Sequence, residues 1–414
     1  MEEWKTYKLG ELAEVKGGKR LPKGNMLTTL RNSHPYIRIR DLGATKTIEL
    51  NSTYEYVEDD VQQLISKYIV KSGDVILSIV GTIGLTAIIG HSLNSANLTE
   101  NCVKFTNLRG VDPNYLYYFL TSPLGQDEIS KGIVGAVQPK LPIKNIQNIS
   151  IPLPEIEAQR RIASILSSID DKIELNRQIN DNLEQQAQAL YKSWFVDFEP
   201  FKDGDFIESE MGLIPVGWHV GKIKEIVNLL SGFPFKSSDF VPDGNYQLIT
   251  IKGVQDGYLD VTSADRISIL PSKMPQYCIL KIGDILISLT GNVGRICIVD
   301  RNNLLLNQRV AILSPKNKRD SFYTYTMFRN ESLKNELVHL ARGTAQLNLS
   351  PIETAEKTTI IPPDCVLETF ARIGKDIFAQ YKYVKMENIR LTELRDTLLP
   401  KLMSGELKIN EIDC

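Results

Sequence analysis

Residues 68–84 read YIVKSGDVILSIVGTIG, and residues 278–294 read CILKIGDILISLTGNVG. Seven of the 17 aligned positions are identical, and six more exchange one aliphatic residue for another. Both stretches place an apolar run after a Gly-Asp pair and follow it with a G-x-x-G turn. A match of this length at a fixed separation indicates an internal repeat, so the fold is predicted to be one unit used twice.

The repeat extends well beyond these two stretches, at an offset that stays near 210 residues. Upstream, Trp4 falls opposite Trp218. Downstream, GAVQPKL (135–141) falls opposite GTAQLNL (343–349), and Asn176 falls opposite Asn388. The small drift in offset is expected if insertions lie in loops.

The first part of each repeat has mixed secondary-structure signals. Short apolar runs at 74–80 and 284–289 predict strands, and Gly, Asn and Pro separate them as turns. A short helix is expected around 115–120 in the first repeat and around 322–340 in the second. Each repeat therefore begins with a globular α/β (α+β) domain.

The last part of each repeat is predicted to be a long helix. Pro154 cannot extend a helix backward, and Glu155 and Glu157 favour the positive end of one. Apolar residues then follow at a 4,3 spacing that is typical of coiled coils. The expected seam contains Ile162, Leu166, Ile169, Ile173, Asn176, Leu183 and Leu190 in the first helix, and Val384, Asn388, Leu391 and Leu398 in the second, where Arg395 interrupts it.

These segments define a four-part chain with a pseudo-twofold repeat. We predict globular domains at 1–151 and 204–360, and helices at 152–203 and 361–414. A helix over 155–194 would be about 60 Å long, so the two helices are expected to form an antiparallel coiled-coil stalk that separates the domains. Asn176 and Asn388 then form a buried polar pair that fixes the register, or alternatively both face solvent.

Composition excludes several classes of protein. The 414 residues carry 48 basic and 50 acidic side chains, a net charge of −2, which excludes binding of nucleic acid through bulk charge alone. The longest apolar runs are too short to span a bilayer, and the first ten residues have no signal-peptide core. Five scattered cysteines without a CxxC pair predict reduced thiols in a cytoplasmic protein, with no membrane association.

Catalytic and metal-binding motifs are missing from the sequence. There is no GxxxxGK[ST] loop, and the four histidines lack HExxH or HxH spacing. Asp74 and Asp284 recur in the repeat, but each opens a strand after a glycine, where an Asx-type turn explains it without catalysis. The chain is therefore predicted to be non-catalytic by itself, with no metal and no cofactor of its own.

One stretch of the first domain is strongly basic. Between Val15 and Arg40 there are seven basic residues and no acidic one. A composition of this kind suits binding of DNA phosphates and base edges, although a solvated surface is the alternative interpretation. The DNA interpretation gains weight because two similar domains on a rigid spacer suit the periodic geometry of a duplex.

Several motifs of the chain carry a resemblance to a known family. They are W-x4-LGEL (4–12), WHVGKIKEI (218–226), KSGDVILS, KIGDILIS, GAVQPKL, GTAQLNL, IPLPEIEAQRRIASILSSIDDKIELN (151–176) and LRDTLLPKLMSGEL (394–407). With these motifs the sequence resembles the specificity subunits of Type I restriction–modification systems. The resemblance covers essentially the whole chain, and the doubled order of its motifs is specific. One departure is IIPPDCVLETFARIG (360–374), which lacks the Glu- and Gln-rich helix start seen at 155–161.

This resemblance implies a non-catalytic subunit of an endonuclease and adenine-N6 methyltransferase complex. Each globular part would be a target recognition domain that reads one half of a bipartite double-stranded DNA target. The helices would set the spacer and dock two methyltransferase subunits. Restriction and translocase subunits would join the same complex, and S-adenosylmethionine, ATP and Mg²⁺ would be bound by these partners.

DNA contacts are expected from basic and amide side chains of both domains. Gln and Asn pair bidentately with adenine, and Lys or Arg with guanine. The alternative for Gln138 and Gln346 is an amide that stabilises its own loop. The candidates are Lys16, Lys19, Arg20, Lys23, Arg38, Gln138 and Lys140 in the first domain, and Lys236, Arg309, Gln346 and Asn348 in the second.

Two other classes of protein stay open at this point. A standalone DNA-binding or chromosome-organising adaptor would have the same domains and helices but no methyltransferase partner. A duplicated polysaccharide- or peptide-processing enzyme would need a pair of catalytic carboxylates, which the sequence does not reveal.

Overall fold

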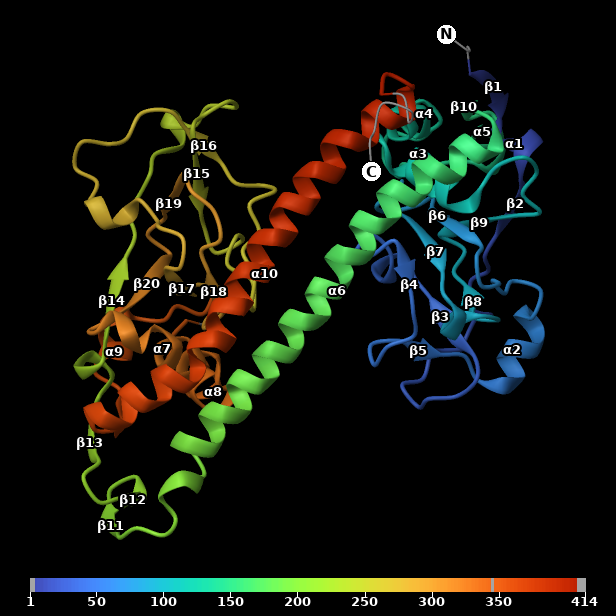
Figure 1. The fold of residues 1–414 in the computed structure, drawn as a ribbon. Coiled ribbons are helices and arrows are strands. Elements are labelled where there is room, and N and C mark those ends of the chain that lie inside the picture. Colours follow the sequence, from blue (N-terminus) through green and yellow to red (C-terminus); the bar gives the residue numbers. More distant parts are fainter. Residues whose placement is uncertain (1–3, 344–345, 408–414) are drawn as a thin grey trace. The chain divides into compact units, whose positions relative to one another are not determined.

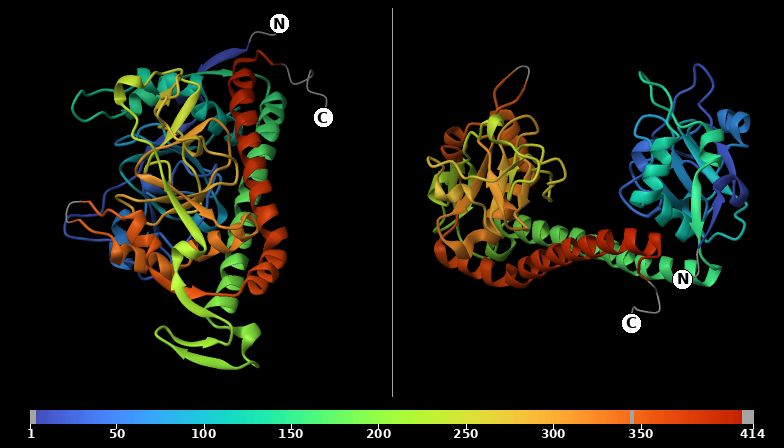
Figure 2. Two further views of the ribbon diagram at one scale, coloured as in Figure 1. Left: turned by 90° about the vertical axis from the view of Figure 1, so that its left-hand side faces the viewer. Right: turned by 90° about the horizontal axis from the view of Figure 1, so that it is seen from above.

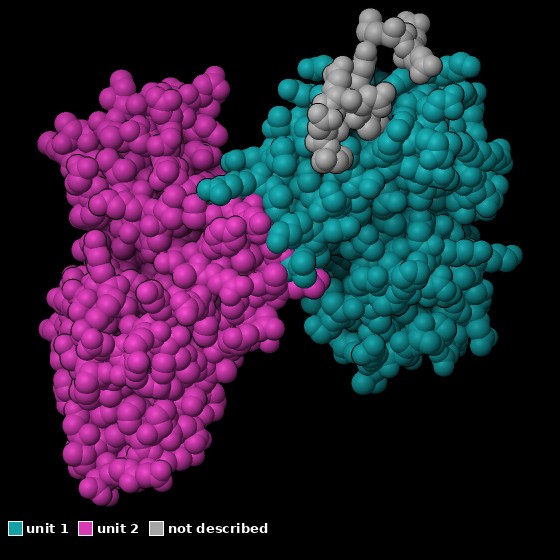
Figure 3. Space-filling model, viewed as in Figure 1, with its two compact units in different colours: residues 1–175, 389–414 teal, residues 176–388 magenta. Residues whose placement is uncertain are grey.

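The computed structural model describes residues 4–343 and 346–407. It divides into two compact units, residues 1–175 with 389–414 and residues 176–388 (Figure 3). Each unit contains one globular head, which corresponds to the globular first part of one repeat, and a portion of both long helices. The boundary between the units falls inside both helices, after Leu175 and after Asn388.

The first head is built on a five-stranded sheet of order β2-β9-β6-β7-β4 and a three-stranded sheet of order β5-β3-β8 (Figure 1). A two-stranded ribbon, β1-β10, joins the start of this head to its end. The strands are β1 (Lys5–Lys8), β2 (Glu14–Gly17), β3 (Pro35–Ile37), β4 (Thr47–Ile48), β5 (Glu55–Tyr56), β6 (Val75–Ser78), β7 (Thr86–Ile89), β8 (Asn97–Leu98), β9 (Cys102–Thr106) and β10 (Ser150–Leu153). The helices are α1 (Leu9–Leu12), α2 (Asp59–Ile65), α3 (Pro113–Thr121), α4 (Pro123–Lys131) and α5 (Ile143–Gln147).

The second head repeats this topology with one strand fewer. Its sheets have the orders β14-β20-β17-β18, β16-β15-β19 and β13-β21, so that only β4 lacks a counterpart among the described strands. The strands are β13 (His219–Lys222), β14 (Val227–Ser231), β15 (Tyr246–Ile249), β16 (Arg266–Ile267), β17 (Ile285–Ser288), β18 (Ile296–Ile298), β19 (Leu304–Leu306), β20 (Val310–Pro315) and β21 (Thr358–Ile361). The helices are α7 (Ser321–Arg329), α8 (Glu331–Leu340) and α9 (Pro351–Ala355).

A hairpin of β11 (Phe206–Ser209) and β12 (Gly212–Pro215) precedes the second head. The predicted mixed fold and its internal repeat are confirmed by this matched strand order. One local prediction needs correction, because the helix expected over 322–340 is two helices. Asn330 lies between them, where its side chain accepts a hydrogen bond from the Ser332 amide and so caps α8.

The two long helices are α6 (Ile156–Phe195) and α10 (Asp364–Ser404). Each follows a proline, Pro154 or Pro363, which has no amide hydrogen to continue a helix backward. The departure at 360–374 does not shorten the second helix, since α10 has 41 residues and α6 has 40. Within each unit they pair antiparallel: Asp170 contacts Arg395 in the first unit, and Asn176 contacts Asn388 in the second.

The helix ends pack into the cores of the heads. In the first unit, Ile162 and Leu166 of α6 and Leu402 of α10 join the apolar core beneath α3 and β9. In the second unit, Leu183 of α6 and Phe370 of α10 join the core beneath α7 and β17. Each unit therefore has a hydrophobic core shared between its head and its stretch of the helix pair.

Candidate nucleic-acid interface

The most similar stretches of the two repeats form the same turn. Ser78 is fully buried, and its Oγ donates to the Thr82 carbonyl at 2.6 Å and accepts from the Leu85 amide at 2.9 Å. Ser288 makes the equivalent bonds to Asn292 at 2.5 Å and Arg295 at 3.0 Å. The four glycines of the two G-x-x-G turns have φ between +73° and +96°, a region that favours glycine. The residues that are identical in the two repeats therefore preserve this turn.

The recurring aspartates have the same kind of structural role. The Asp74 carboxylate accepts a hydrogen bond from the Lys71 amide at 2.9 Å, and Asp284 accepts one from the Lys281 amide at 2.7 Å. Both bonds close a turn immediately before a strand. Both aspartates therefore stabilise a turn, but the bond comes from the amide three residues earlier, which is not the predicted Asx-turn geometry.

A short hairpin loop lies against the turn in each head. In the first head, the Val134 and Lys140 backbones exchange hydrogen bonds of 2.9 and 3.0 Å, and Lys140 also forms a bridge to Val80. In the second head, Arg342 and Asn348 exchange bonds of 3.0 and 2.8 Å. In each head this loop lies on the side away from the long helices (Figure 2).

The second-head loop brings three of the predicted DNA-binding residues together. Arg309, Gln346 and Asn348 line one open pocket of about 420 Å³, together with Gln308 and Thr290. The Asn348 Oδ1 accepts from the Thr290 hydroxyl at 2.9 Å. A Cβ added to Gly291 would lie 3.3 Å from the Gln346 Nε2, so this amide lies against the G-x-x-G turn. Lys236 does not line the pocket and is exposed at the start of a 3-10 turn, Ser237–Asp239.

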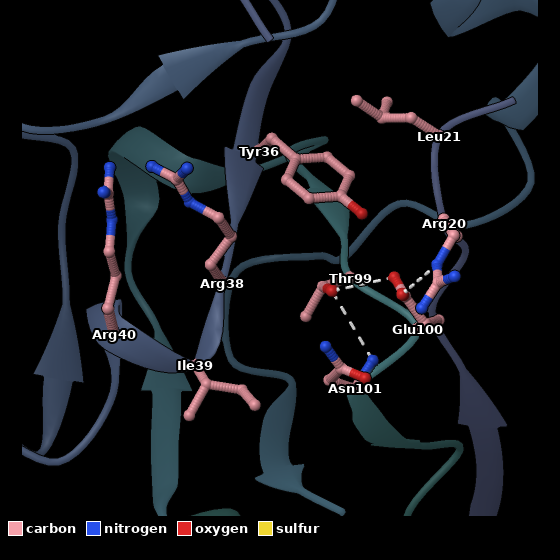
Figure 4. Close-up of a pocket in the computed structure, with 9 residues that line it drawn as sticks. All are labelled: Arg20, Leu21, Tyr36, Arg38, Ile39, Arg40, Thr99, Glu100 and Asn101. Atoms are coloured by element: carbon pink, nitrogen blue, oxygen red, sulfur yellow. Dashed lines mark hydrogen bonds and ion pairs between the residues drawn. The ribbon is translucent and has the colours of Figure 1, made fainter. Parts of the chain in front are cut away.

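The first-head pocket has a different, arginine-rich lining. It measures about 390 Å³ and contains Arg20, Arg38 and Arg40 around Tyr36 and Glu100 (Figure 4). Tyr36 is buried, and its hydroxyl donates to the Lys19 carbonyl at 2.8 Å. Lys16, Lys19, Lys23, Gln138 and Lys140 do not line this pocket, although all five are exposed on the same head.

Two of these arginines form ion pairs with the carboxylate of Glu55. Glu55 forms ion pairs with Arg38 and, at 3.0 Å, with Arg40. Arg40 also lies 3.7 Å from Asp41. Burial raises the pKa of Asp41 to about 6, with Arg40 opposing the shift and Glu55 adding to it. The acid-free stretch from Val15 to Arg40 is therefore not uniformly positive once the chain has folded.

The remaining basic residues of this stretch differ in their surroundings. Lys16 pairs with Glu14 at 2.8 Å, and Arg20 pairs with Glu100 at 2.6 Å. The Lys19 ammonium lies 5.7 Å from the centre of the Tyr68 ring. Lys23 is exposed in the loop that follows.

Sequence reasoning missed the turn that precedes β9 and β20. It contributes Thr99, Glu100 and Asn101 to the first pocket and Gln308 and Arg309 to the second, of which only Arg309 was a candidate. Aligning TENC (99–102) with NQRV (307–310) would have shown that this position repeats with changed polar residues.

The helix seam is buried for most of its length. Ile162, Leu166, Ile169, Ile173, Asn176, Leu183 and Val384 are each less than 9% exposed. Leu190, Asn388, Leu391 and Leu398 are half-buried. Near its C-terminal end, α6 buries Tyr191 and Phe195, because there it packs into the core of the second head.

Arg395, which interrupts the seam, has a specific partner. Its Nη1 donates to the Asp170 Oδ1 at 2.9 Å, and the Tyr118 hydroxyl of α3 donates to the other Asp170 oxygen at 2.7 Å. In the second unit, the Tyr325 hydroxyl of α7 donates to Glu184 of α6 at 2.6 Å. A tyrosine from the head thus hydrogen-bonds a carboxylate of α6 in each unit.

Residues 4–343 and 346–407 lack the marks of two other kinds of site. This part of the chain contains no group of three or more His, Cys, Asp or Glu side chains suited to hold a metal ion. None of its helices is long and apolar enough to cross a membrane.

The two repeats of this chain match a known family of DNA specificity domains. The model of the family described as "Type I restriction modification DNA specificity domain" matches residues 1–185 and again residues 215–375. The chain therefore belongs to this family, as a specificity subunit of a Type I restriction–modification system.

Curated relatives and a solved structure agree with this assignment. The chain is 26% identical to the Type I restriction enzyme MjaIX specificity subunit of Methanocaldococcus jannaschii, over 99% of this chain and 95% of the relative. It is 25% identical to the HindI specificity subunit of Haemophilus influenzae, over 98% and 100%. The crystal structure of an S subunit from M. genitalium covers 96% of both chains at a TM-score of 0.55 and 18% identity, which supports the fold.

Proposed function

We propose that each head reads one half of a bipartite double-stranded DNA target and that the paired helices set the unread spacer between the halves. The observation that carries this proposal is the duplicated specificity domain, which matches once in each repeat. In support, each head has an open pocket lined by side chains able to donate to base edges. The two pockets share the turn before β9 and β20, and their other lining residues come from different parts of the repeat.

Phosphate contacts would come from the exposed lysines of the first head. Lys16, Lys19, Lys23 and Lys140 are all exposed and lie on the head that carries the arginines. Such contacts position a protein on the duplex, whereas base contacts select the sequence. The exposed Gln138 and the pocket residues are therefore the candidates for specificity.

The helices would also dock two methyltransferase subunits. Both helices carry large apolar side chains that are exposed, including Leu175 at 51%, Leu394 at 47% and Tyr383 at 63%. Exposed apolar side chains on helices that already share a buried seam are suited to pack against further helices.

In this proposal the chain performs no chemistry itself and acts in the cytoplasm, where its DNA target lies. Methyltransferase subunits would bind S-adenosylmethionine and methylate adenine N6. Restriction and translocase subunits would bind ATP and Mg²⁺, and would depend on this chain to locate their target.

The test is the methylation pattern of the assembled complex. The full chain, co-expressed with its methyltransferase subunits, should methylate a bipartite sequence with a fixed spacer, read by methylation-sensitive genome sequencing. Gln138→Ala should alter only one half of that sequence, and Gln346→Ala only the other. Two results would contradict the proposal that each head reads one half of the target. One is a single continuous target, and the other is a target that either variant changes in both halves.

A further inference from the structure

We infer that Arg20 reads a guanine in the half-target of the first head, and that Glu100 is the residue that positions it. The inference rests on the proposed function and assigns a base and a pair of side chains to one of its two pockets. Three observations carry it: the fixed backbone beneath Arg20, the carboxylate on one edge of its guanidinium, and the exposure of the other edge.

The backbone that carries Arg20 is held close to the turn before β9. The Gly18 amide donates to the Cys102 carbonyl at 3.0 Å, and the Lys19 amide donates to the Leu98 carbonyl at 2.8 Å. A Cβ at Gly18 would lie 2.0 Å from the Thr99 carbonyl oxygen, so only glycine allows this approach. Arg20 therefore leaves the backbone from a defined position.

Glu100 holds the guanidinium with one oxygen and is itself fixed through the other. Its Oε1 accepts from the Arg20 Nε at 2.6 Å, and its Oε2 accepts from the Thr99 hydroxyl at 3.1 Å (Figure 4). Burial raises the pKa of Glu100, but hydrogen bonds from Arg20 and Thr99 lower it by more. The pKa of this carboxyl therefore lies below its usual value. The carboxylate is consequently ionised at neutral pH and holds Arg20 through a charge-assisted bond.

The terminal edge of the Arg20 guanidinium is open. The Arg20 side chain is 79% exposed, and within the described residues its Nη1 and Nη2 have no hydrogen-bond partner. The other two arginines of the pocket differ, since Glu55 binds Arg38, and both Glu55 and the Thr53 carbonyl bind Arg40. Of the three arginines, Arg20 has the most exposed side chain and the terminal nitrogens most available to a ligand.

This arrangement suits a guanine better than a phosphate. The two terminal nitrogens of arginine donate bidentately to O6 and N7 of guanine in the major groove. The adjacent Glu100 offsets the positive charge of Arg20, which weakens attraction for a phosphate but leaves directional donors for a neutral base edge. Orientation by a carboxylate also reduces the conformational freedom that Arg20 would lose on binding.

The second head lacks this pair. Gly232 occupies the position of Gly18, since its amide donates to the Val310 carbonyl at 3.1 Å. Counting from these matched positions, Arg20 corresponds to Pro234, and Glu100 corresponds to Gln308. Any loss of discrimination caused by Arg20 or Glu100 substitutions should therefore be confined to one half of the target.

The experiment uses the full chain assembled with its methyltransferase subunits. The wild-type target is read by methylation sequencing, and binding is then measured on duplexes with each position of each half-target replaced in turn. The variants are Arg20→Ala, Arg20→Lys and Glu100→Ala, with Lys23→Ala as the matched basic control and thermal melting as the check of folding.

Arg20→Ala should reduce discrimination at one G·C pair of a single half-target by about 5- to 150-fold, the loss expected for one bidentate contact. Arg20→Lys should keep the salt dependence of binding but lose discrimination at the same pair, because lysine has no planar fork.

Glu100→Ala should lower that discrimination while strengthening binding to unrelated DNA, since it removes a negative charge. Lys23→Ala should weaken binding to all duplexes alike.

Several outcomes would overturn the inference. These are a half-target for the first head that contains no G·C pair, an unchanged base preference in Arg20→Ala, full discrimination in Arg20→Lys, or changes in both half-targets. The proposed function fails in a different way, because the wild-type complex would then have no bipartite target at all.

Discussion

The Asn176 amide of α6 donates a hydrogen bond of 2.9 Å to the Asn388 Oδ1 of α10, and the Asn176 side chain is fully buried. The same Asn176 nitrogen lies 2.7 Å from the Glu387 carboxylate. These asparagines occupy equivalent positions in the two repeats, so of the two alternatives for this pair, the buried polar contact is confirmed. A buried polar pair in an apolar seam favours one register, because any slip would leave the amides without partners.

The first prediction concerns the energetic coupling of this pair. A double-mutant cycle of Asn176→Leu and Asn388→Leu should give a coupling free energy of about 0.5 to 3 kcal/mol, as expected for residues in direct contact. The measurement is urea unfolding of the full chain. Gln185→Leu, at an exposed position of the same helix, should combine additively with Asn388→Leu. Additivity of the two asparagine changes would show that the contact has no role in register.

The second prediction concerns the ion pair at the interruption of the seam. Arg395→Ala should lower the free energy of unfolding by about 1 to 3 kcal/mol, because it leaves the largely buried Asp170 carboxylate without its cation. The double variant Asp170→Leu with Arg395→Leu should recover most of this loss, since apolar groups can replace a buried pair. Chemical denaturation checks both, and a double variant weaker than Arg395→Ala would refute this account.

The third prediction concerns phosphate contacts. Lys19→Ala with Lys23→Ala should flatten the plot of log affinity against log salt by about 0.9 per lost contact, or about 1.8 in total. Base preference should stay as in the wild type, because phosphate contacts carry no sequence information. Binding of the assembled complex to its target is measured between low and moderate salt. An unchanged slope would mean that these lysines face away from DNA.

The fourth prediction separates docking from folding. Leu175→Asp and Leu394→Asp change exposed positions, so they should reduce co-purification of methyltransferase subunits while leaving the melting temperature nearly unchanged. Ile169→Asp should instead lower the melting temperature, because it places an unpaired charge at a position only 8% exposed. Normal co-purification with both exposed variants would place docking elsewhere.

The fifth prediction uses the repeat itself. A fragment of residues 1–203 should dimerise, because at the 212-residue offset Asn176 of one copy would pair with Asn176 of the other. In this dimer the same offset places Leu183 of one copy where Arg395 lies in the full chain. Asp170 of the other copy would then lack its cation. Leu183→Arg should therefore strengthen the fragment dimer, as measured by analytical ultracentrifugation. A fragment that stays monomeric with either residue would show that the two helices are not interchangeable.

Local patterns in the sequence determined the repeat, the mixed heads and the long helices. The glycines and serine of the KSGDVILSIVGTIG stretch recur because the same turn must be built twice, and that requirement is visible without tertiary contacts. Prolines before each long helix and the 4,3 apolar spacing likewise act within a few residues of one another. The resemblance to specificity subunits followed from the order of these motifs.

Tertiary structure alone decided which candidate side chains have open donors and where the seam ends. The carboxylate that holds Arg20 lies 80 residues away in the sequence, so the basic stretch by itself looked uniformly positive. The carboxylate that pairs with Arg395 lies 225 residues away. Near its C-terminal end, α6 buries Tyr191 and Phe195 because it enters the core of a head there. Charge partners and burial depend on contacts between segments that are distant in the sequence. Composition and periodicity do not reveal those contacts.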